Sequence, residues 1–266
     1  MLSKTDIEAA AKILDHAEQT RSQVKPLTLQ FGDMTMEDAY AIQECWVGLK
    51  CARGATVTGY KIGLTSRAMQ QAMHIDTPDY GVLLDEMAFN SGATIRAEDF
   101  LDPRIEAEFG FVMKKSLFGA EVTLEQVLDA TDYVVPALEL ISARSTRTDP
   151  TTGYTRTVFD TIADNAANAG YIVGRQHCDP HSELRFAGAL VYVDGVIEES
   201  GLGGAVMEHP AHGICWVCKR FAPHGIGLEA GQFVLSGSFT RPVAVRPGTK
   251  IHADYGSLGT IDVQFE

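Results

Sequence analysis

The segment PRIEAEFGFVM (residues 103–113) reads as a buried β-strand that carries two glutamates. Residues i and i+2 of a strand share a face, so the odd-numbered positions form one wholly apolar face. Its side chains are those of Ile105, Ala107, Phe109, Phe111 and Met113. Glu106 and Glu108 project together from the other face, about 6.6 Å apart by the strand rise. Their charges repel each other, and a cation between them would remove that penalty.

A second apolar segment, YVVPALELI (residues 133–141), carries Glu139. Carboxylates in buried strands are costly unless a positive charge meets them. A divalent cation that prefers oxygen ligands is the most economical answer, and three carboxylates leave octahedral Mg²⁺ or Mn²⁺ room for waters and a chelating substrate. The alternative is a solvated strand face with ordinary surface acids. The pattern alone does not place residue 139 beside residue 106.

The remaining sequence divides into a helical beginning and a longer strand-rich part. Apolar residues at positions 7, 10, 13 and 14 have helical spacing, with Thr5 and Glu8 as a capping box. A second helix is expected from Thr35 to Gly54. From about residue 57, short apolar runs alternate with Gly, Pro and Asp turns, without βαβ regularity. We therefore expect an α+β protein with an N-terminal helical region (1–55) and a strand-rich catalytic domain (56–266).

Composition and charge narrow the class of partner. The 266 residues carry a formal net charge of −13 and no basic run, which argues against nucleic acid and anionic membrane surfaces. No window approaches the roughly 18 consecutive apolar residues of a membrane span. The N-terminus lacks the apolar core of a signal peptide, and five cysteines do not suggest a disulfide framework. The expected location is the cytoplasm.

Six motifs, in order along nearly the whole chain, carry a family resemblance. They are GYKIGLTS (59–66), TPDYGVLLDEM (77–87), PRIEAEFGFV (103–112), DYVVPALELI (132–141), FDTIADNAANAGYIVG (159–174) and LSGSFTRPV (235–243). Together they resemble the hydratase and decarboxylase branch of the fumarylacetoacetate hydrolase superfamily. The long arginine-bearing segment before FDTI resembles the hydratases of that branch more than its decarboxylases.

The resemblance implies a mixed, rolled β-sheet core and a Mg²⁺ ion, with Mn²⁺ as the alternative. It implies that Glu106, Glu108 and Glu139 hold the ion and that Lys61 is the active-site lysine. The implied activity is a metal-dependent hydratase (a hydro-lyase) of aromatic meta-cleavage catabolism, such as homoprotocatechuate degradation. Its substrate would be a 2-oxo-enoate or 2-hydroxydienoate diacid. A homo-oligomer is the family habit.

Three other activities remain open at this point. The chain could be a 4-oxalocrotonate decarboxylase or a 2-oxopent-4-enoate hydratase of the same branch, or a non-enzymatic scaffold or regulatory subunit. The three glutamates and Lys61 argue against the non-enzymatic reading. The family's hydrolases use a Glu–His pair on an N-terminal lid, and no equivalent motif is present in this sequence, which argues against carbon–carbon bond hydrolysis.

Further site residues follow as hypotheses. Lys61 would support or protonate the substrate near its 2-oxygen, and Asp79 in PDYG would shuttle a proton, although Pro-Asp-Tyr-Gly is also ordinary turn chemistry. Gly237 and Ser238 would present N–H groups to a substrate carboxylate. The far carboxylate of a diacid needs a cation. Arginine suits this role because it binds carboxylates in a bidentate manner. The candidates, which could equally be solvated loop residues, are Arg144, Arg147 and Arg156.

Overall fold

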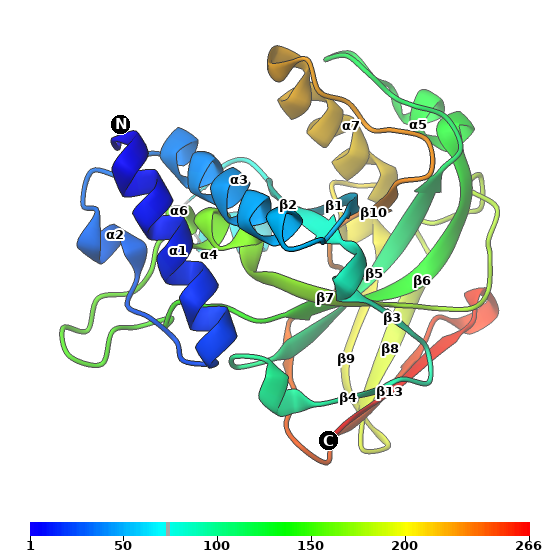
Figure 1. The fold of residues 1–266 in the computed structure, drawn as a ribbon. Helices are drawn as coiled ribbons and strands as arrows, with labels where there is room; N and C mark the ends of the chain where they lie inside the picture. The colour runs from blue at the N-terminus through cyan, green and yellow to red at the C-terminus, as the bar shows by residue number, and fades with distance from the viewer. Residues whose placement is uncertain (73–74) are drawn as a thin grey trace.

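Two β-sheets and a layer of helices make up the computed structural model, which describes residues 1–72 and 75–266 (Figure 1). The larger sheet has the strand order β2-β1-β10-β5-β6-β7-β3, with β11 paired to β5. Its strands are β1 (Val57–Gly63), β2 (Asp79–Leu84), β3 (Ala88–Asn90), β5 (Arg104–Met113), β6 (Thr131–Ile141), β7 (Asn168–Val173), β10 (Phe233–Leu235) and β11 (Val243–Ala244). The sheet is mixed, because β1 pairs with β10 and β3 with β7 in parallel while the other pairs are antiparallel.

The smaller sheet has the order β4-β13-β12-β8-β9. Its strands are β4 (Thr94–Ile95), β8 (Gly188–Val193), β9 (Val196–Leu202), β12 (Lys250–Asp254) and β13 (Thr260–Phe265). The hairpin between β8 and β9 turns through Asp194 and Gly195, both with positive φ (51° and 86°). Asp-Gly is a preferred pair for such a turn.

Seven α-helices and six short 3₁₀ turns are present among the described residues. The α-helices are α1 (Lys4–Thr20), α2 (Leu27–Gln30), α3 (Met36–Ala52), α4 (Arg67–Ala72), α5 (Leu124–Ala130), α6 (Val158–Ala163) and α7 (Pro210–Phe221). The 3₁₀ turns are η1 (Asp85–Met87), η2 (Ala97–Asp99), η3 (Asn165–Ala167), η4 (Gly203–Ala205), η5 (Ala222–His224) and η6 (Gly256–Leu258). Within the described ranges, no helix combines the length and hydropathy needed to cross a bilayer.

The N-terminal helices begin at side-chain caps. The expected second helix is present as α3, where Thr35 and Asp38 form a reciprocal capping box. The first helix starts earlier than predicted. Ser3 and Asp6 form its capping box, and the Thr5–Glu8 assignment was wrong because Thr5 already lies inside the helix. Thr and Ser two positions apart offer the same cap chemistry, and sequence did not decide between them.

The larger sheet packs on both faces, which explains the apolar character of its central strands. One face meets α1, α3 and α6 in a core that includes Leu83, Ala137, Tyr171 and Leu235. The opposite face meets the smaller sheet and α7, with Ile105, Phe109 and Phe111 among its buried side chains. Figure 1 shows the N-terminal helices α1 and α3 on one side of this sheet and the smaller sheet on the other. The α+β fold with mixed sheets and N-terminal helices is confirmed.

Candidate active site

The three glutamates meet on the helix-covered face of the larger sheet. Glu106 of β5 lies directly opposite Glu139 of β6 in the antiparallel register, and Glu108 follows on the same face of β5. One carboxylate oxygen from each lies within 4.8 Å of the others. Glu108 and Glu139 are buried, whereas Glu106 keeps partial access to solvent. Strand pairing therefore supplies the proximity that the sequence pattern alone left open.

The electrostatics of this cluster call for more positive charge than the side chains supply. Burial, and then the neighbouring charge of Glu139, raise the pKa of Glu106 to about 8. The same two causes raise the pKa of Glu108 well above its usual range. A divalent cation would offset both burial and repulsion, and an all-oxygen ligand set suits Mg²⁺ or Mn²⁺. The residues present fit such an ion.

Lys61 supplies one positive charge from β1. Its side chain is buried, and its Nζ lies 3.1 Å from Glu139 Oε1 and 3.5 Å from Oε2. Burial alone would lower the pKa of Lys61, but the carboxylates of Glu139 and Asp79 more than offset it, and the net shift is upward. The side chain is therefore an ammonium ion directed at the carboxylate cluster.

Asp79 begins β2 next to this lysine. It is 1% exposed, and its Oδ1 has no hydrogen-bond partner within residues 1–72 and 75–266. Burial raises the pKa of Asp79 to about 6, although Lys61 acts in the opposite direction. Gly63 opposite makes room for both groups, because a Cβ there would collide with Asp79 Oδ1 and lie 3.1 Å from Lys61 Nζ. The structure brings Lys61, Asp79 and the three glutamates together, as the sequence motifs suggested.

Gly237 has a different contact from the one predicted. Its backbone N–H donates to Glu108 Oε2 at 2.9 Å, so this donor holds a glutamate and is not directed to a substrate. Its φ of 115° and the closeness of the Thr65 side chain leave no space for a Cβ. Ser238 follows, and its Oγ donates to the carbonyl of Thr240 at 2.8 Å. A substrate contact from the Ser238 backbone stays a prediction.

Arg144 is a structural cation in this fold. Its side chain is buried, with Nη1 3.1 Å from Asp164 Oδ1 and Nη2 2.9 Å from Glu18 Oε1. The guanidinium also lies over the ring of Trp46, 4.7 Å from the ring centroid. These partners occupy the guanidinium nitrogens that a substrate carboxylate would need. The predicted substrate contact of Arg144 is therefore corrected to a link between β6, α6 and the N-terminal helices.

The other two arginines lie in the loop that leaves β6 at the Glu139 end. Arg147 is exposed and Arg156 is partly buried, and the backbone N–H of Arg156 donates to the Arg147 carbonyl at 2.9 Å. Arg156 Nη1 also donates to the Ser145 carbonyl at 3.0 Å. Thr148 and Thr155 pair across the same loop. Both arginines stay candidates for the distal carboxylate.

Asn168 is a site residue that sequence reasoning missed. It is fully buried at the start of β7, and its Nδ2 donates to Glu139 Oε1 at 2.9 Å. The preceding residues Asn165, Ala166 and Ala167 all have positive φ. The DNAAN string carried a signal for this turn, because Asn is enriched among non-glycine residues with positive φ.

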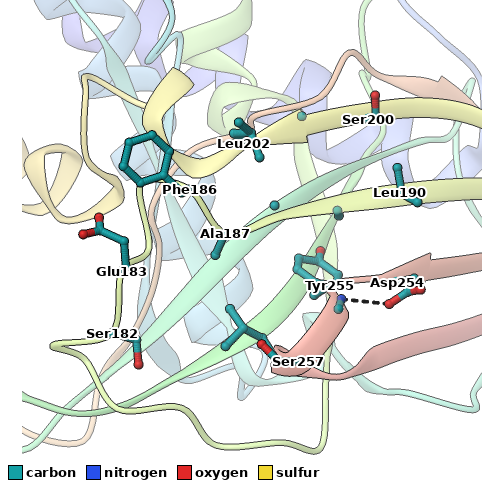
Figure 2. Close-up of a pocket in the computed structure, with 15 residues that line it drawn as sticks. Ser182, Glu183, Phe186, Ala187, Leu190, Ser200, Leu202, Asp254, Tyr255 and Ser257 are labelled. Carbon is teal, nitrogen blue, oxygen red and sulfur yellow. Dashed lines mark hydrogen bonds between the residues drawn. The ribbon is translucent and has the colours of Figure 1, made fainter.

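A broad groove of about 820 Å³ lies elsewhere, on the smaller sheet (Figure 2). Its lining includes the apolar side chains of Phe186, Leu190 and Leu202 and the carboxylates of Glu183 and Asp254. None of the three glutamates lines it. The size of this groove does not outweigh the convergence of carboxylates and a lysine on the other sheet, so we place the chemistry at the glutamates.

Comparisons with known proteins show what the whole chain is similar to. No protein-family model matches the chain. It is 50% identical over 266 residues to 2-oxo-hept-4-ene-1,7-dioate hydratase of Escherichia coli, with 100% of both chains covered. It is 35% identical over 260 residues to 2-keto-4-pentenoate hydratase of Paraburkholderia xenovorans, covering 97% of this chain and 94% of that one.

Solved structures give the same answer for the fold. The 4-oxalocrotonate decarboxylase of Pseudomonas putida G7, complexed with magnesium and adipate, superposes with a TM-score of 0.94 at 31% identity, covering 100% of this chain and 99% of that one. Fumarylpyruvate hydrolase of Pseudomonas aeruginosa, with Mn²⁺ and pyruvate, shares the fold at a TM-score of 0.58 and 15% identity, over 77% of this chain and 88% of that one. The chain thus belongs to the hydratase and decarboxylase branch of the fumarylacetoacetate hydrolase superfamily.

Proposed function

We propose that this protein is a divalent metal-dependent hydratase that converts 2-oxo-hept-4-ene-1,7-dioate to 4-hydroxy-2-oxoheptanedioate. The observation that carries the proposal is the cluster of three carboxylates within 4.8 Å, faced by a buried lysine. The full-length 50% identity to a hydratase named for this substrate supports the choice of reaction. This reaction is a step of aromatic meta-cleavage catabolism, and we assign the protein to that process.

Glu106, Glu108 and Glu139 would hold Mg²⁺, with Mn²⁺ as an alternative of the same ligand preference. The chemistry supplied by the bound ion is Lewis-acid polarisation of the substrate's 2-oxygen. The magnesium and manganese complexes of the two related structures support this assignment. The partial exposure of Glu106 leaves the cluster accessible from its side of the sheet.

Beside the ion, Lys61 would stabilise negative charge and Asp79 would transfer protons. Net hydration moves one proton from C3 to C5, adds hydroxide at C4 and returns the proton of water to C3. The Lys61 ammonium would stabilise negative charge that develops on the 2-oxygen during these transfers. Asp79 would carry the proton, since its buried Oδ1 has no protein partner within the described ranges and lies in the same hollow as Lys61.

Decarboxylation is the second candidate activity, because the decarboxylase structure superposes with a TM-score of 0.94. The test is to incubate the protein with Mg²⁺ and either the heptenedioate or 4-oxalocrotonate. Ultraviolet absorbance and carbon dioxide release are followed together. Loss of absorbance without gas is expected. Gas release would establish the decarboxylase, and no reaction with either substrate would contradict both enzymatic proposals.

Arg147 and Arg156 would bind the distal carboxylate that distinguishes this diacid from 2-oxopent-4-enoate. We expect Arg147→Met or Arg156→Met to raise KM for the diacid about tenfold or more, as loss of a charge-assisted contact does. The KM for the monoacid should stay unchanged. Arg246→Met, at an exposed loop arginine, serves as the control. Equal effects on both substrates would contradict the assignment.

A further inference from the structure

Two nitrogen donors meet Oε1 of Glu139, and one of them, Lys61 Nζ, also reaches Oε2 at 3.5 Å. Asn168 Nδ2 lies 2.9 Å from its Oε1, and Lys61 Nζ lies 3.1 Å from the same atom. A carboxylate whose Oε1 is held by two donors cannot rotate freely about its last bond. The other oxygen is then directed by the protein and not by the ion.

Asn168 is itself held by an unusual turn. Asn165, Ala166 and Ala167 have φ values of 52°, 51° and 58°, a left-handed run that residues with a Cβ rarely adopt. The Asn165 side chain secures the turn to β2. Its Oδ1 accepts from the Val82 N–H at 2.7 Å, and its Nδ2 donates to the Val82 carbonyl at 2.9 Å. The turn thus fixes where the next strand starts.

A buried cation secures the backbone of Asn168 as well. Arg144 Nη2 donates to the Asn168 carbonyl at 3.0 Å, while Nη1 contacts Asp164 just before the turn. The Asn168 side chain is therefore placed by contacts on both sides of the residue. Its Oδ1 is buried and has no partner in the part of the chain that the structure describes. The shortest hydrogen bond of the amide is the one to Glu139, and Nδ2 also reaches the Gly170 carbonyl at 3.5 Å.

We infer that Asn168 is a positioning residue for the metal centre, which fixes the carboxylate of Glu139 for the divalent ion. The inference rests on the proposed metal-dependent function. Gly237 has the corresponding role at Glu108, where its N–H holds Oε2. Partners that orient a metal ligand typically change metal affinity or activity about 10–100-fold when removed. Asn168 is expected to act in this range without touching the ion or the substrate.

The test is Mn²⁺ binding to the full chain, measured from the electron paramagnetic resonance signal of free Mn²⁺. Asn168→Ala should raise the dissociation constant about 10–100-fold. Asn168→Ser, which keeps a small donor, should give a smaller loss and covers the case in which the alanine variant does not fold. Saturating Mg²⁺ should restore most of kcat to the folded variants, because the reacting groups are intact.

Tyr171→Phe is the matched control. Tyr171 pairs with Glu139 in the β6–β7 register, and its hydroxyl approaches Thr58 at 3.4 Å. This variant loses a polar contact in the same part of the sheet, and its Mn²⁺ affinity should equal that of the wild type. Wild-type affinity in a folded Asn168 variant would overturn the inference while leaving the metal site intact. A wild-type chain that binds no Mn²⁺ would instead overturn the proposed function, and this inference with it.

Discussion

At the scale of single residues, the glutamate cluster destabilises the metal-free protein and provides a binding site for a cation. Glu106 and Glu108 have raised pKa values because their burial and the charge of Glu139 oppose ionisation. The nearby ammonium of Lys61 offsets only part of this cost, since both pKa values remain raised in its presence. A site that is costly without an ion is well suited to bind one.

Replacing one of these carboxylates separates its effect on metal binding from its effect on the stability of the metal-free protein. Glu108→Gln keeps the side-chain size but removes a ligand charge, so we expect loss of Mn²⁺ binding and of metal-dependent turnover. The metal-free variant should melt at a higher temperature than the metal-free wild type, because one buried repulsion is gone. Thermal denaturation in EDTA and a Mn²⁺ titration measure the two effects. Full activity of the variant in chelator would exclude the metal mechanism.

At the scale of elements, the end of β10 shows how backbone geometry supports the cluster. Gly237 combines a φ of 115° with close contact to Thr65, and its N–H reaches Glu108. Gly231, before the same strand, has a φ of 89° but open space around its Cβ position. The two glycines therefore share a backbone requirement and differ in packing.

This pair gives a matched experiment. Gly231→Ala should lower the free energy of unfolding by about 1–2 kcal/mol, the cost of a Cβ in the left-handed region. Gly237→Ala should cost more and should also weaken Mn²⁺ binding, because the Cβ must push Thr65 or shift the N–H away from Glu108. Chemical denaturation and Mn²⁺ titration of both variants measure this. Equal stabilities and equal Mn²⁺ affinities would contradict the role given to Gly237.

Arg144 links elements that are distant in the sequence. Asp164, its partner, is also buried, so removal of the arginine leaves an unpaired buried charge. Arg144→Met should therefore lower the free energy of unfolding by about 3–5 kcal/mol. Arg53→Met, which breaks a more exposed pair with Asp15, should cost no more than about 1 kcal/mol. Unchanged stability of Arg144→Met, with a raised KM for the diacid alone, would restore the substrate role predicted from sequence.

The sequence predicted local features better than long-range ones. Strand alternation placed Glu106 and Glu108 on one face because a period of two needs no knowledge of the fold. The pairing of Glu106 with Glu139 depends on register between two strands, and the motif resemblance supplied it before the structure did. Arg144 was misjudged because its partner Glu18 lies 126 residues away. No local pattern distinguishes such a buried pair from a loop arginine.

At the scale of the whole molecule, the glutamate cluster lies where the main layers meet. Its ligands come from β5 and β6 in the middle of the larger sheet, on the face that the N-terminal helices cover (Figure 1). The opposite face of the same strands packs against the smaller sheet. An ion held by β5 and β6 therefore links the central strands of the fold. Its binding free energy should stabilise the entire folded chain.

Metal binding should accordingly stabilise the folded protein as a unit. An ion at 100 times its dissociation constant adds about 2.7 kcal/mol to the free energy of unfolding. For a chain of this size that corresponds to a rise in Tm of roughly 5–10 °C. Differential scanning calorimetry with Mg²⁺, with Mn²⁺ and with EDTA measures the shift. Glu108→Gln is the control and should show none. A similar rise in that variant would mean that the ions act elsewhere on the acidic surface and not at the three glutamates.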